Sequence, residues 1–319
     1  MSPRLDSHSL AMARSVSRDL RLGGHWRWGQ RLKNGGIRLC VIGLLGLADR
    51  LPERLLYSVC RAVGRLVYWT APSLVRRARE RAGLALPDAE VSRVVRECFL
   101  NAGTTLATSL LLRRPNVKAS ALVAIDAPAR ELLAGAGGAV VVSAHLGPFE
   151  LVAPAVAELG LPTAIVVRES YDPALDAHVD AHRRARGVTV IHRGDPGAGA
   201  RIVRALRSGQ LVGVLPDLPA RVESARVDFL GTPSEMPIGP ARIALAAGVP
   251  LLAACLAPLG DGRRFRLEVS RIDPAGLSAT TLTQRVANAL SRAILLAPAW
   301  WLWMAAKGPG DLEKKRSAR

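Results

Sequence analysis

Aromatic residues are scarce in this chain of 319 residues: they make up 4% of it, although hydrophobic residues as a whole make up 49%. A protein that binds nucleic acid by base stacking needs aromatic side chains, so such binding would here depend on charge alone. The high apolar content excludes a disordered chain, which has too little apolar surface to bury. No internal repeat or glycine period is present, which excludes collagen-like and other fibrous proteins.

Acidic residues are also in the minority. The chain has 26 Asp and Glu against 44 Lys and Arg, a formal net charge of +18, and more than half of this excess lies in residues 1–100. A balance this basic favours an anionic partner, which is nucleic acid, an anionic membrane face or an acidic carrier protein. A GC-rich coding sequence would also enrich arginine without any function, so the charge alone identifies no partner.

Cysteine is rare, and its positions show no pairing pattern. The chain has four cysteines, Cys40, Cys60, Cys98 and Cys255, with no CxxC spacing, and three of the four lie inside apolar runs. This usage predicts buried free thiols in a reducing compartment and excludes a disulfide or zinc framework.

The N-terminal region lacks a long apolar run. Residues 1–36 are polar and basic, so no signal peptide is expected and this segment is predicted to be flexible. The first strong apolar run, Leu39–Ala48, has ten residues, whereas a membrane-spanning helix needs about 20. The stretch Leu51–Trp69 then shows apolar side chains on one helical face and Arg54, Arg61 and Arg65 on another. We therefore interpret residues 37–70 as membrane-associating helices; the alternative is a helix packed on the core.

Residues 71–305 read as one α/β domain. A helix is expected over 88–112, with a basic turn at Arg76–Arg81 before it. From about residue 130, short apolar runs alternate with helical stretches, as in a mixed, mostly parallel sheet flanked by helices. The predicted strands are 139–143, 163–168, 188–191, 211–215, 249–257 and 263–271, and the helices between and after them are 149–159, 172–186, 198–208, 239–247 and 280–296. A polar basic tail, 306–319, follows.

His145 is the candidate catalytic residue. It follows the strand 139–143, and the carboxyl ends of strands are where open α/β sheets bind ligands. Glu150 lies five residues later, across a turn that contains Gly147, so the two side chains can meet. The carboxylate would fix the imidazole tautomer, and the other ring nitrogen would take a proton from a hydroxyl group. The alternative is a loop histidine beside an unrelated glutamate at a helix start.

Other candidate sites are weaker. His178 and His182 have a spacing that suits a divalent metal, but no third ligand is evident and we expect no metal. The stretch Gly194–Arg201 is neither a Walker A loop nor a dinucleotide motif, so a glycine turn is the better interpretation. The absence of a GxSxG motif excludes an α/β-hydrolase serine nucleophile.

The segment Ser143–Glu150 resembles the H-x4-D/E motif of the lysophospholipid acyltransferase superfamily. Within it, the chain is similar to the branch of the late acyltransferases of lipid A biosynthesis and the phosphatidylinositol mannoside acyltransferases. That branch usually reads HxGNWE, and here Pro148 and Phe149 replace Asn and Trp. The resemblance covers roughly residues 35–305, although Leu218 and Met304–Lys307 depart from the usual pattern. Its further matches are Arg168 at a strand end, 206–217, 227–231, 237–250 and 297–303.

The resemblance implies a glycerol-3-phosphate acyltransferase-like fold and an O-acyltransferase. Such an enzyme moves a fatty acyl group from acyl carrier protein or acyl-CoA to a hydroxyl of a lipid or glycolipid acceptor, with no metal or bound cofactor. It would work at an anionic membrane surface, on the cytoplasmic face of the bacterial inner membrane, as a peripheral or monotopic protein that binds no nucleic acid. His145 would be the general base and Glu150 would orient it, and the residues implied in substrate binding are Arg168, Asp217, Gly147, Phe229 and Gly231.

Two other functions remain open from the sequence. One is an inactive lipid-binding membrane protein with the same fold, against which the retained His145 and Glu150 argue. The other is a basic nucleic-acid-binding protein, which only the net charge of +18 supports.

Overall fold

The computed structural model describes residues 43, 45–46, 48–168, 173–218 and 222–305. These residues form a single α/β domain built on a seven-stranded sheet of order β1-β9-β8-β2-β5-β3-β4. Only β9 runs antiparallel to its neighbour β8, and the other pairs are parallel. The predicted segments 1–36 and 306–319 and most of the run Leu39–Ala48 lie outside the described residues, so their boundaries stay predictions.

The six strands expected from the apolar runs are all present in the sheet. They are β2 (Ala139–Val142), β3 (Thr163–Val167), β4 (Val188–His192), β5 (Leu211–Val214), β8 (Leu251–Leu259) and β9 (Arg264–Ile272). The seventh strand, β1, has two residues, Val123–Ala124, and is too short to leave a pattern in the sequence. All four residues of β2 are buried, because this strand is central and helices cover both faces of the sheet.

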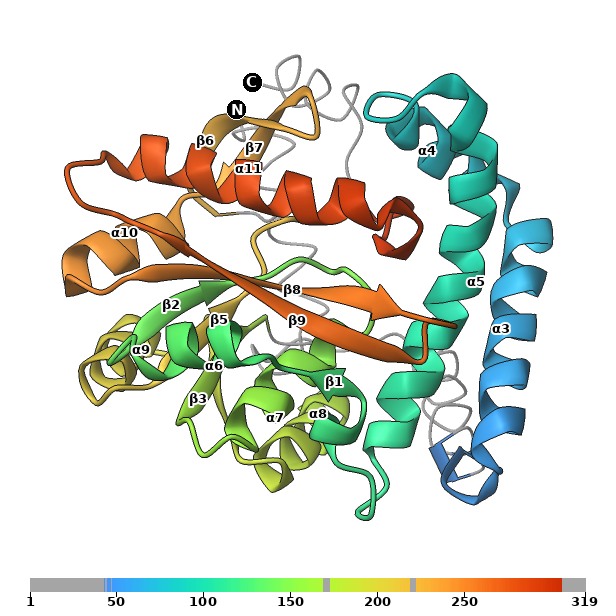
Figure 1. Cartoon of the computed structure of the whole chain (residues 1–319), viewed down its shortest axis with the longest axis horizontal. Coiled ribbons are helices and arrows are strands. Elements are labelled where there is room, and N and C mark those ends of the chain that lie inside the picture. Colours follow the sequence, from blue (N-terminus) through green and yellow to red (C-terminus); the bar gives the residue numbers. More distant parts are fainter. Residues whose placement is uncertain (1–42, 44, 47, 169–172, 219–221, 306–319) are drawn as a thin grey trace, which may run out of the picture.

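Helices cover both faces of the sheet. Figure 1 shows α11 (Ala279–Leu296) along one face of β8 and β9, with α6 (Ala127–Ala134) and α7 (Val152–Ala157) on the opposite face. The buried side chains accordingly divide into two clusters, one on each side of the sheet. The first side also holds α9 (Ala198–Arg207) and α10 (Gly239–Ala247), whereas α8 (Pro173–Ala185) contacts the edge strand β4.

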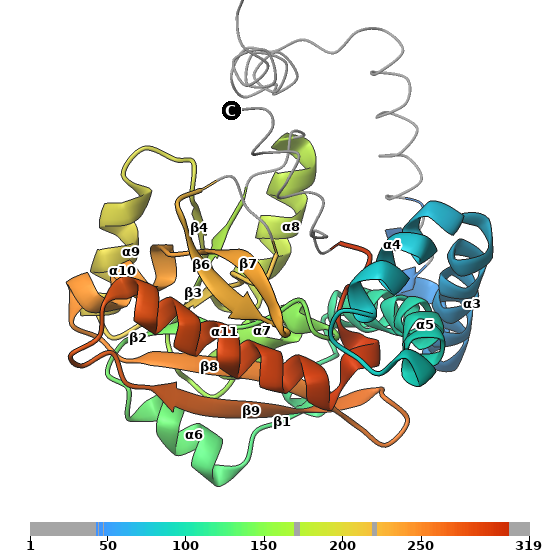
Figure 2. The same ribbon diagram turned by 90° about the horizontal axis from the view of Figure 1, so that it is seen from above.

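A small antiparallel hairpin was not predicted from the sequence. Strands β6 (Ser224–Phe229) and β7 (Thr232–Pro237) pair around a turn in which Leu230 and Gly231 both have positive φ. The hairpin packs on α11, and Figure 2 shows the two side by side. Strand β6 alternates the exposed Arg226 and Asp228 with buried apolar side chains, as a half-buried strand does. The prediction rested on continuous apolar runs, which this hairpin lacks, and so it missed the strand.

The basic turn predicted at Arg76–Arg81 is wrong: this stretch belongs to helix α4 (Pro72–Ala82). Pro72 stands at the first helical position, where proline is favoured, and Arg79 and Arg81 occupy the last turn, where cations stabilise the helix dipole. A run of arginines is compatible with a helix because arginine has a high helix propensity.

Helices α3 (Glu53–Thr70) and α5 (Asp88–Leu112) stand together beside the sheet (Figure 1). The two helices approach closely at Gly64 and Gly103, where a side chain would not fit. A Cβ atom added to Gly64 would lie 2.3 Å from the carbonyl oxygen of Phe99, and a Cβ atom added to Gly103 would lie 2.2 Å from the carbonyl oxygen of Cys60. The helix α3 confirms the helix expected over Leu51–Trp69. Within the described part of the chain, no helix is long and apolar enough to cross a membrane.

Helix α3 is apolar on two sides. Its buried side, with Leu56, Tyr57 and Cys60, packs in the core, while a second row of large apolar side chains is exposed. We call this row the α3 apolar stripe; it consists of Leu55, Val59, Val63, Leu66 and Trp69. A helix that only packed on a core would bury its apolar side chains and leave no such row.

Candidate active site

His145 and Asp217 follow two neighbouring strands, β2 and β5, beyond the carboxyl ends of these strands. Strand β2 pairs in parallel with β5, Val142 beside Val214, and the Ser143 N–H donates to the Val214 carbonyl oxygen at 3.0 Å. The chain then leaves β2 towards α7 on one face and β5 towards the hairpin and α10 on the other. Ligand crevices of open α/β sheets form where neighbouring strands part in this way.

Asp217 holds the imidazole of His145. Its Oδ1 lies 2.8 Å from His145 Nδ1, and its Oδ2 accepts a hydrogen bond from the backbone N–H of the same residue at 2.8 Å. The Asp217 side chain is 0% exposed, and the His145 side chain is 23% exposed. A buried carboxylate on Nδ1 orients the ring and leaves Nε2 available to a substrate, because Nε2 makes no hydrogen bond within the described residues.

A third hydrogen bond reaches Asp217 from the C-terminal end of the domain. The indole Nε1–H of Trp301 donates to Asp217 Oδ2 at 2.9 Å. Both carboxylate oxygens therefore have partners, as a buried charged group requires. This tryptophan belongs to the segment 297–303, which the sequence matched to the family pattern without any assigned role.

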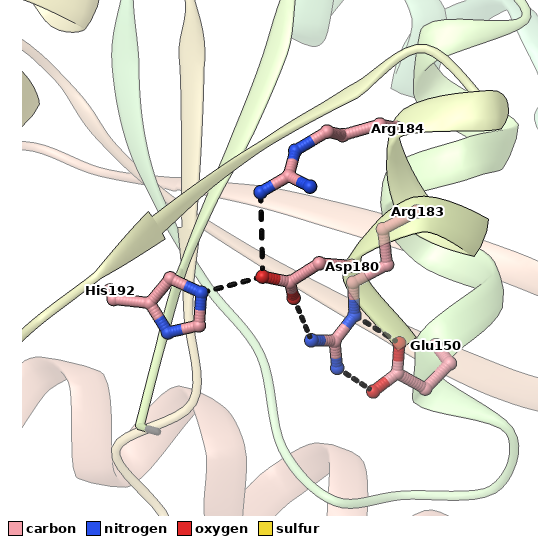
Figure 3. A network of polar contacts seen from close by, with 5 residues as sticks. All are labelled: Glu150, Asp180, Arg183, Arg184 and His192. Carbon is pink, nitrogen blue, oxygen red and sulfur yellow. Dashed lines mark hydrogen bonds and ion pairs between the residues drawn. The ribbon is translucent and has the colours of Figure 1, made fainter. Parts of the chain in front are cut away.

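Glu150 has a different partner from the one expected. Its two oxygens bind Arg183 of α8, at 2.7 Å to Nη2 and 3.2 Å to Nε (Figure 3). The carboxylate on the His145 ring is that of Asp217, so the direct His145–Glu150 contact expected from their spacing is corrected. After Gly147, whose φ is +59°, the chain forms a short 3-10 helix, Phe149–Leu151, and the Phe149 ring lies against the imidazole at 4.7 Å between centroids.

Arg183 extends this pair into a partly buried polar network, shown in Figure 3. Asp180, on the same helix, lies 3.6 Å from Arg183 Nη1 and 2.6 Å from Nε2 of His192 at the end of β4. Although burial alone would lower the pKa of Arg183, its hydrogen bond to Glu150 and the charges of Glu150 and Asp180 raise it. The network thus ties helix α8 to the loop that carries His145. Arg183 left no signal in the sequence, where it is one arginine among many.

The other predicted site residues have visible structural roles. A Cβ atom on Gly147 would lie 3.3 Å from Phe265, so this glycine allows close packing of the His145 loop. Phe229 packs edge-to-face against Trp301, with centroids 5.8 Å apart, and Gly231 forms the hairpin turn. Their contacts with substrate stay predictions.

The sequence as a whole matches a known family. The family model described as bacterial lipid A biosynthesis acyltransferase matches residues 30–307, which is most of the chain. The chain belongs to this family. Among its relatives is the phosphatidylinositol mannoside acyltransferase of Mycobacterium tuberculosis (strain CDC 1551 / Oshkosh), 25% identical over 190 residues that cover 59% of this chain and 60% of the relative. The same-named protein of Mycolicibacterium smegmatis is 32% identical over 94 residues, which cover 30% of this chain and 31% of the relative.

Two buried thiols of this chain, those of Cys98 and Cys255, are poor nucleophiles. Burial raises the pKa of Cys98 and of Cys255 to about 12, and Cys60, Cys98 and Cys255 are all buried and free. These three confirm the prediction of buried free thiols, whereas Cys40 lies outside the described residues. A thiol with so high a pKa is protonated near neutral pH, so an acyl-cysteine intermediate at Cys98 or Cys255 is disfavoured.

Two arginines of the chain follow the neighbouring strands β3 and β4. Val167 pairs with His192, and the Arg193 N–H donates to the Val167 carbonyl oxygen at 3.0 Å, so Arg168 and Arg193 directly follow the last residue pair of the two strands. Both are exposed. Arg193 was missed in the sequence because the order of the strands was unknown.

No group of three or more His, Cys, Asp or Glu side chains that could hold a metal is present in the described ranges, which include His178 and His182. Burial, followed by the charges of Arg186 and Arg113, lowers the pKa of His182.

Proposed function

We propose that this acyltransferase moves a fatty acyl group from a thioester to a hydroxyl of a lipid or glycolipid, with His145 as general base. The observation that carries the proposal is the buried Asp217 carboxylate, 2.8 Å from His145 Nδ1 on a ring that is still 23% exposed. This is the arrangement of a base whose tautomer and orientation are fixed by a carboxylate. The carboxylate on the imidazole is that of Asp217, and not that of Glu150 as the spacing in the sequence predicts.

The reaction follows from this geometry. His145 Nε2 takes the proton of the acceptor hydroxyl while the hydroxyl oxygen attacks the thioester carbonyl carbon. The new C–O bond forms, the C–S bond breaks, and the departing thiolate takes the proton back from the imidazolium. Asp217 stabilises the imidazolium while it lasts. A base and an activated thioester suffice for this chemistry, so we propose no metal and no bound cofactor.

The substrates are proposed from the family and from the basic side chains at the sheet edge. The named relatives are phosphatidylinositol mannoside acyltransferases, and the family is named for lipid A biosynthesis, so a glycolipid is the proposed acceptor. Arg168, with Arg193 beside it, is proposed to bind an anionic group of the donor or acceptor. The donor is acyl-CoA or acyl carrier protein, whose acidic surface would suit a chain with a net charge of +18.

The proposed place of action is the cytoplasmic face of the bacterial inner membrane. The α3 apolar stripe, in which Trp69 is 74% exposed, would enter the acyl region of the lipid. Arg54, Arg61 and Arg65 are exposed on the same helix and would lie against lipid phosphates. This supports peripheral or monotopic binding, as expected for the predicted helices 37–70.

The experiment for the reaction supplies purified protein with labelled acyl-ACP or acyl-CoA and an extract of bacterial glycolipids, and identifies products by mass spectrometry. We expect an ester-linked acyl glycolipid from wild type and from His178→Ala, a matched control on the exposed face of α8, and none from His145→Ala. Absence of product from wild type with every donor, together with vesicle binding, would favour the inactive lipid-binding alternative.

The experiment for the membrane uses flotation with vesicles of phosphatidylglycerol or phosphatidylcholine. We expect wild type to bind the anionic vesicles and Leu66→Glu to lose binding, while Val179→Glu, an exposed apolar position on α8, binds normally. Equal vesicle binding by both variants would show that the α3 apolar stripe does not contribute to membrane binding. Steeply salt-dependent binding to DNA with no vesicle binding would favour a nucleic-acid-binding protein.

A further inference from the structure

Trp301 is connected to the catalytic histidine through a single shared residue. We propose that it is a positioning residue: its indole N–H fixes the Asp217 carboxylate, and Asp217 in turn fixes the imidazole of His145. The inference rests on the proposed function of His145.

The hydrogen bonds of Asp217 divide unequally between its two oxygens. Oδ2 accepts two of them, from the His145 backbone N–H at 2.8 Å and from Trp301 Nε1–H at 2.9 Å. Oδ1 is left for His145 Nδ1 at 2.8 Å. Two donors at one oxygen fix the plane of the carboxylate, so the other oxygen is aimed at the imidazole. Without the indole N–H, the carboxylate is held at Oδ2 by one donor and can rotate.

The indole is itself held rigidly. Trp301 is 2% exposed and packs edge-to-face between Phe229 and Trp303, with centroids 5.8 Å and 4.8 Å away. Its carbonyl oxygen accepts a hydrogen bond from the Cys98 thiol of α5 at 3.0 Å. A side chain with so little freedom loses little entropy when it holds its partner, which is what a positioning residue requires.

The backbone beside Trp301 is joined to the His145 loop as well. Leu146 and Trp301 form an isolated β-bridge, and the Gly147 N–H donates to the Trp300 carbonyl oxygen at 2.9 Å. Donor, carboxylate and histidine therefore belong to one rigid unit, although Trp301 lies 84 residues from Asp217 in the sequence.

The alternative is that Trp301 serves packing alone, and Trp303 provides the matched control. It lies in the same segment, is 1% exposed, and also donates an indole hydrogen bond, but to the carbonyl oxygen of Pro298 at 2.7 Å. Trp303→Phe thus removes a buried indole N–H that does not reach Asp217, and it keeps an aromatic ring beside Trp301. Trp301→Phe keeps an aromatic ring and removes the N–H that reaches Asp217.

The experiment compares kcat, KM and the thermal midpoint of these two variants. We expect Trp301→Phe to lower kcat about tenfold with little change in KM, because a hydrogen bond to a charged group contributes more than one to a neutral group. Trp303→Phe should change kcat by less than about twofold at a similar loss of thermal midpoint. In an Asp217→Asn background, Trp301→Phe should have no further effect on kcat, because the two residues act as one unit.

The outcomes separate the inference from the proposed function. Equal kcat in Trp301→Phe and Trp303→Phe, or full additivity with Asp217→Asn, overturns the inference alone, provided that His145→Ala and Asp217→Asn have lost activity. Wild-type kcat in His145→Ala and Asp217→Asn overturns the proposed base and this inference together. Trp301→Leu, which lacks the indole N–H and introduces no other donor, takes the place of Trp301→Phe if that variant does not fold.

Discussion

Two carboxylates lie near His145, and substitution by the matching amides distinguishes their roles. Asp217→Asn and Glu150→Gln each remove one negative charge and keep the shape of the side chain. The structure places Asp217 on the His145 ring and Glu150 on Arg183. We therefore expect Asp217→Asn to lose more activity than Glu150→Gln.

The expected loss of stability and activity in Asp217→Asn follows from the three N–H groups that lie against the Asp217 carboxylate. An asparagine amide offers one acceptor oxygen and one NH2 group. The NH2 group would therefore face at least one of the N–H groups from which Asp217 accepts a hydrogen bond. A buried donor left unpaired costs about 1–3 kcal/mol of stability. The imidazolium also loses its counter-charge and the ring its fixed tautomer. General-base catalysis contributes roughly 10²–10⁴-fold, and most of that range should be lost from kcat.

The magnitude for Glu150→Gln is smaller. Glutamine keeps one acceptor oxygen for Arg183, which also retains Asp180 at 3.6 Å, and the Glu150 side chain is 37% exposed. We expect kcat to fall by up to about tenfold, because the loop that carries His145 would be held less firmly, while the Asp217 contact with the imidazole would remain. Arg183→Gln should cause a similar loss, with no further loss in the double variant.

The assay is the initial rate of labelled ester formation at saturating donor, with circular dichroism to confirm folding. A loss in Glu150→Gln equal to or larger than that in Asp217→Asn would refute the reasoning, because it would make Glu150 the carboxylate on which the base depends.

Three further predictions concern the helix pair, the pH dependence and the paired arginines. Gly103→Ala would place a methyl group 2.2 Å from the Cys60 carbonyl oxygen. It should lower the free energy of unfolding by about 3 kcal/mol, measured by chemical unfolding. A change near zero in that free energy would contradict the close approach of α3 and α5. Burial lowers the pKa of His182 in the folded chain, so near and below its usual value of 6.5 the unfolded chain binds more protons than the folded chain. Stability should therefore fall as the pH drops from 7 to 5. His182→Gln should flatten this fall in thermal midpoint, and an unchanged slope would contradict the prediction. Arg168→Ala and Arg193→Ala should each raise KM for the anionic substrate and weaken the salt dependence of KM, whereas Arg271→Ala, an exposed control on β9, should do neither.

Much of the fold could be predicted from local pattern. Strands such as β2 and β5 are continuous apolar runs because both of their faces are buried, and that burial is visible in the sequence. The β6–β7 hairpin and the two-residue β1 lack such runs. Their positions are set by packing and pairing with distant elements, such as α11 for the hairpin.

The part of the site that is local in sequence, His145 and the loop after it, could be predicted. His145 could be located because it follows a recognisable strand. Its partner Asp217 is 72 residues away, and the contact depends on β2 and β5 being neighbours, which spacing cannot reveal. Spacing in the sequence points to the nearest carboxylate, Glu150. It cannot indicate the hydrogen bond from Trp301 to Asp217 either, because these residues are 84 positions apart.

The single-turnover rate of ester formation by purified protein, with acyl thioester and glycolipid acceptor, tests the role of His145 most directly. We expect His145→Ala to lower that rate at least about 100-fold, while His178→Ala stays within about twofold of wild type. Ester formation by a folded His145→Ala variant at the wild-type rate would contradict the proposal that this imidazole accepts the proton of the acceptor hydroxyl.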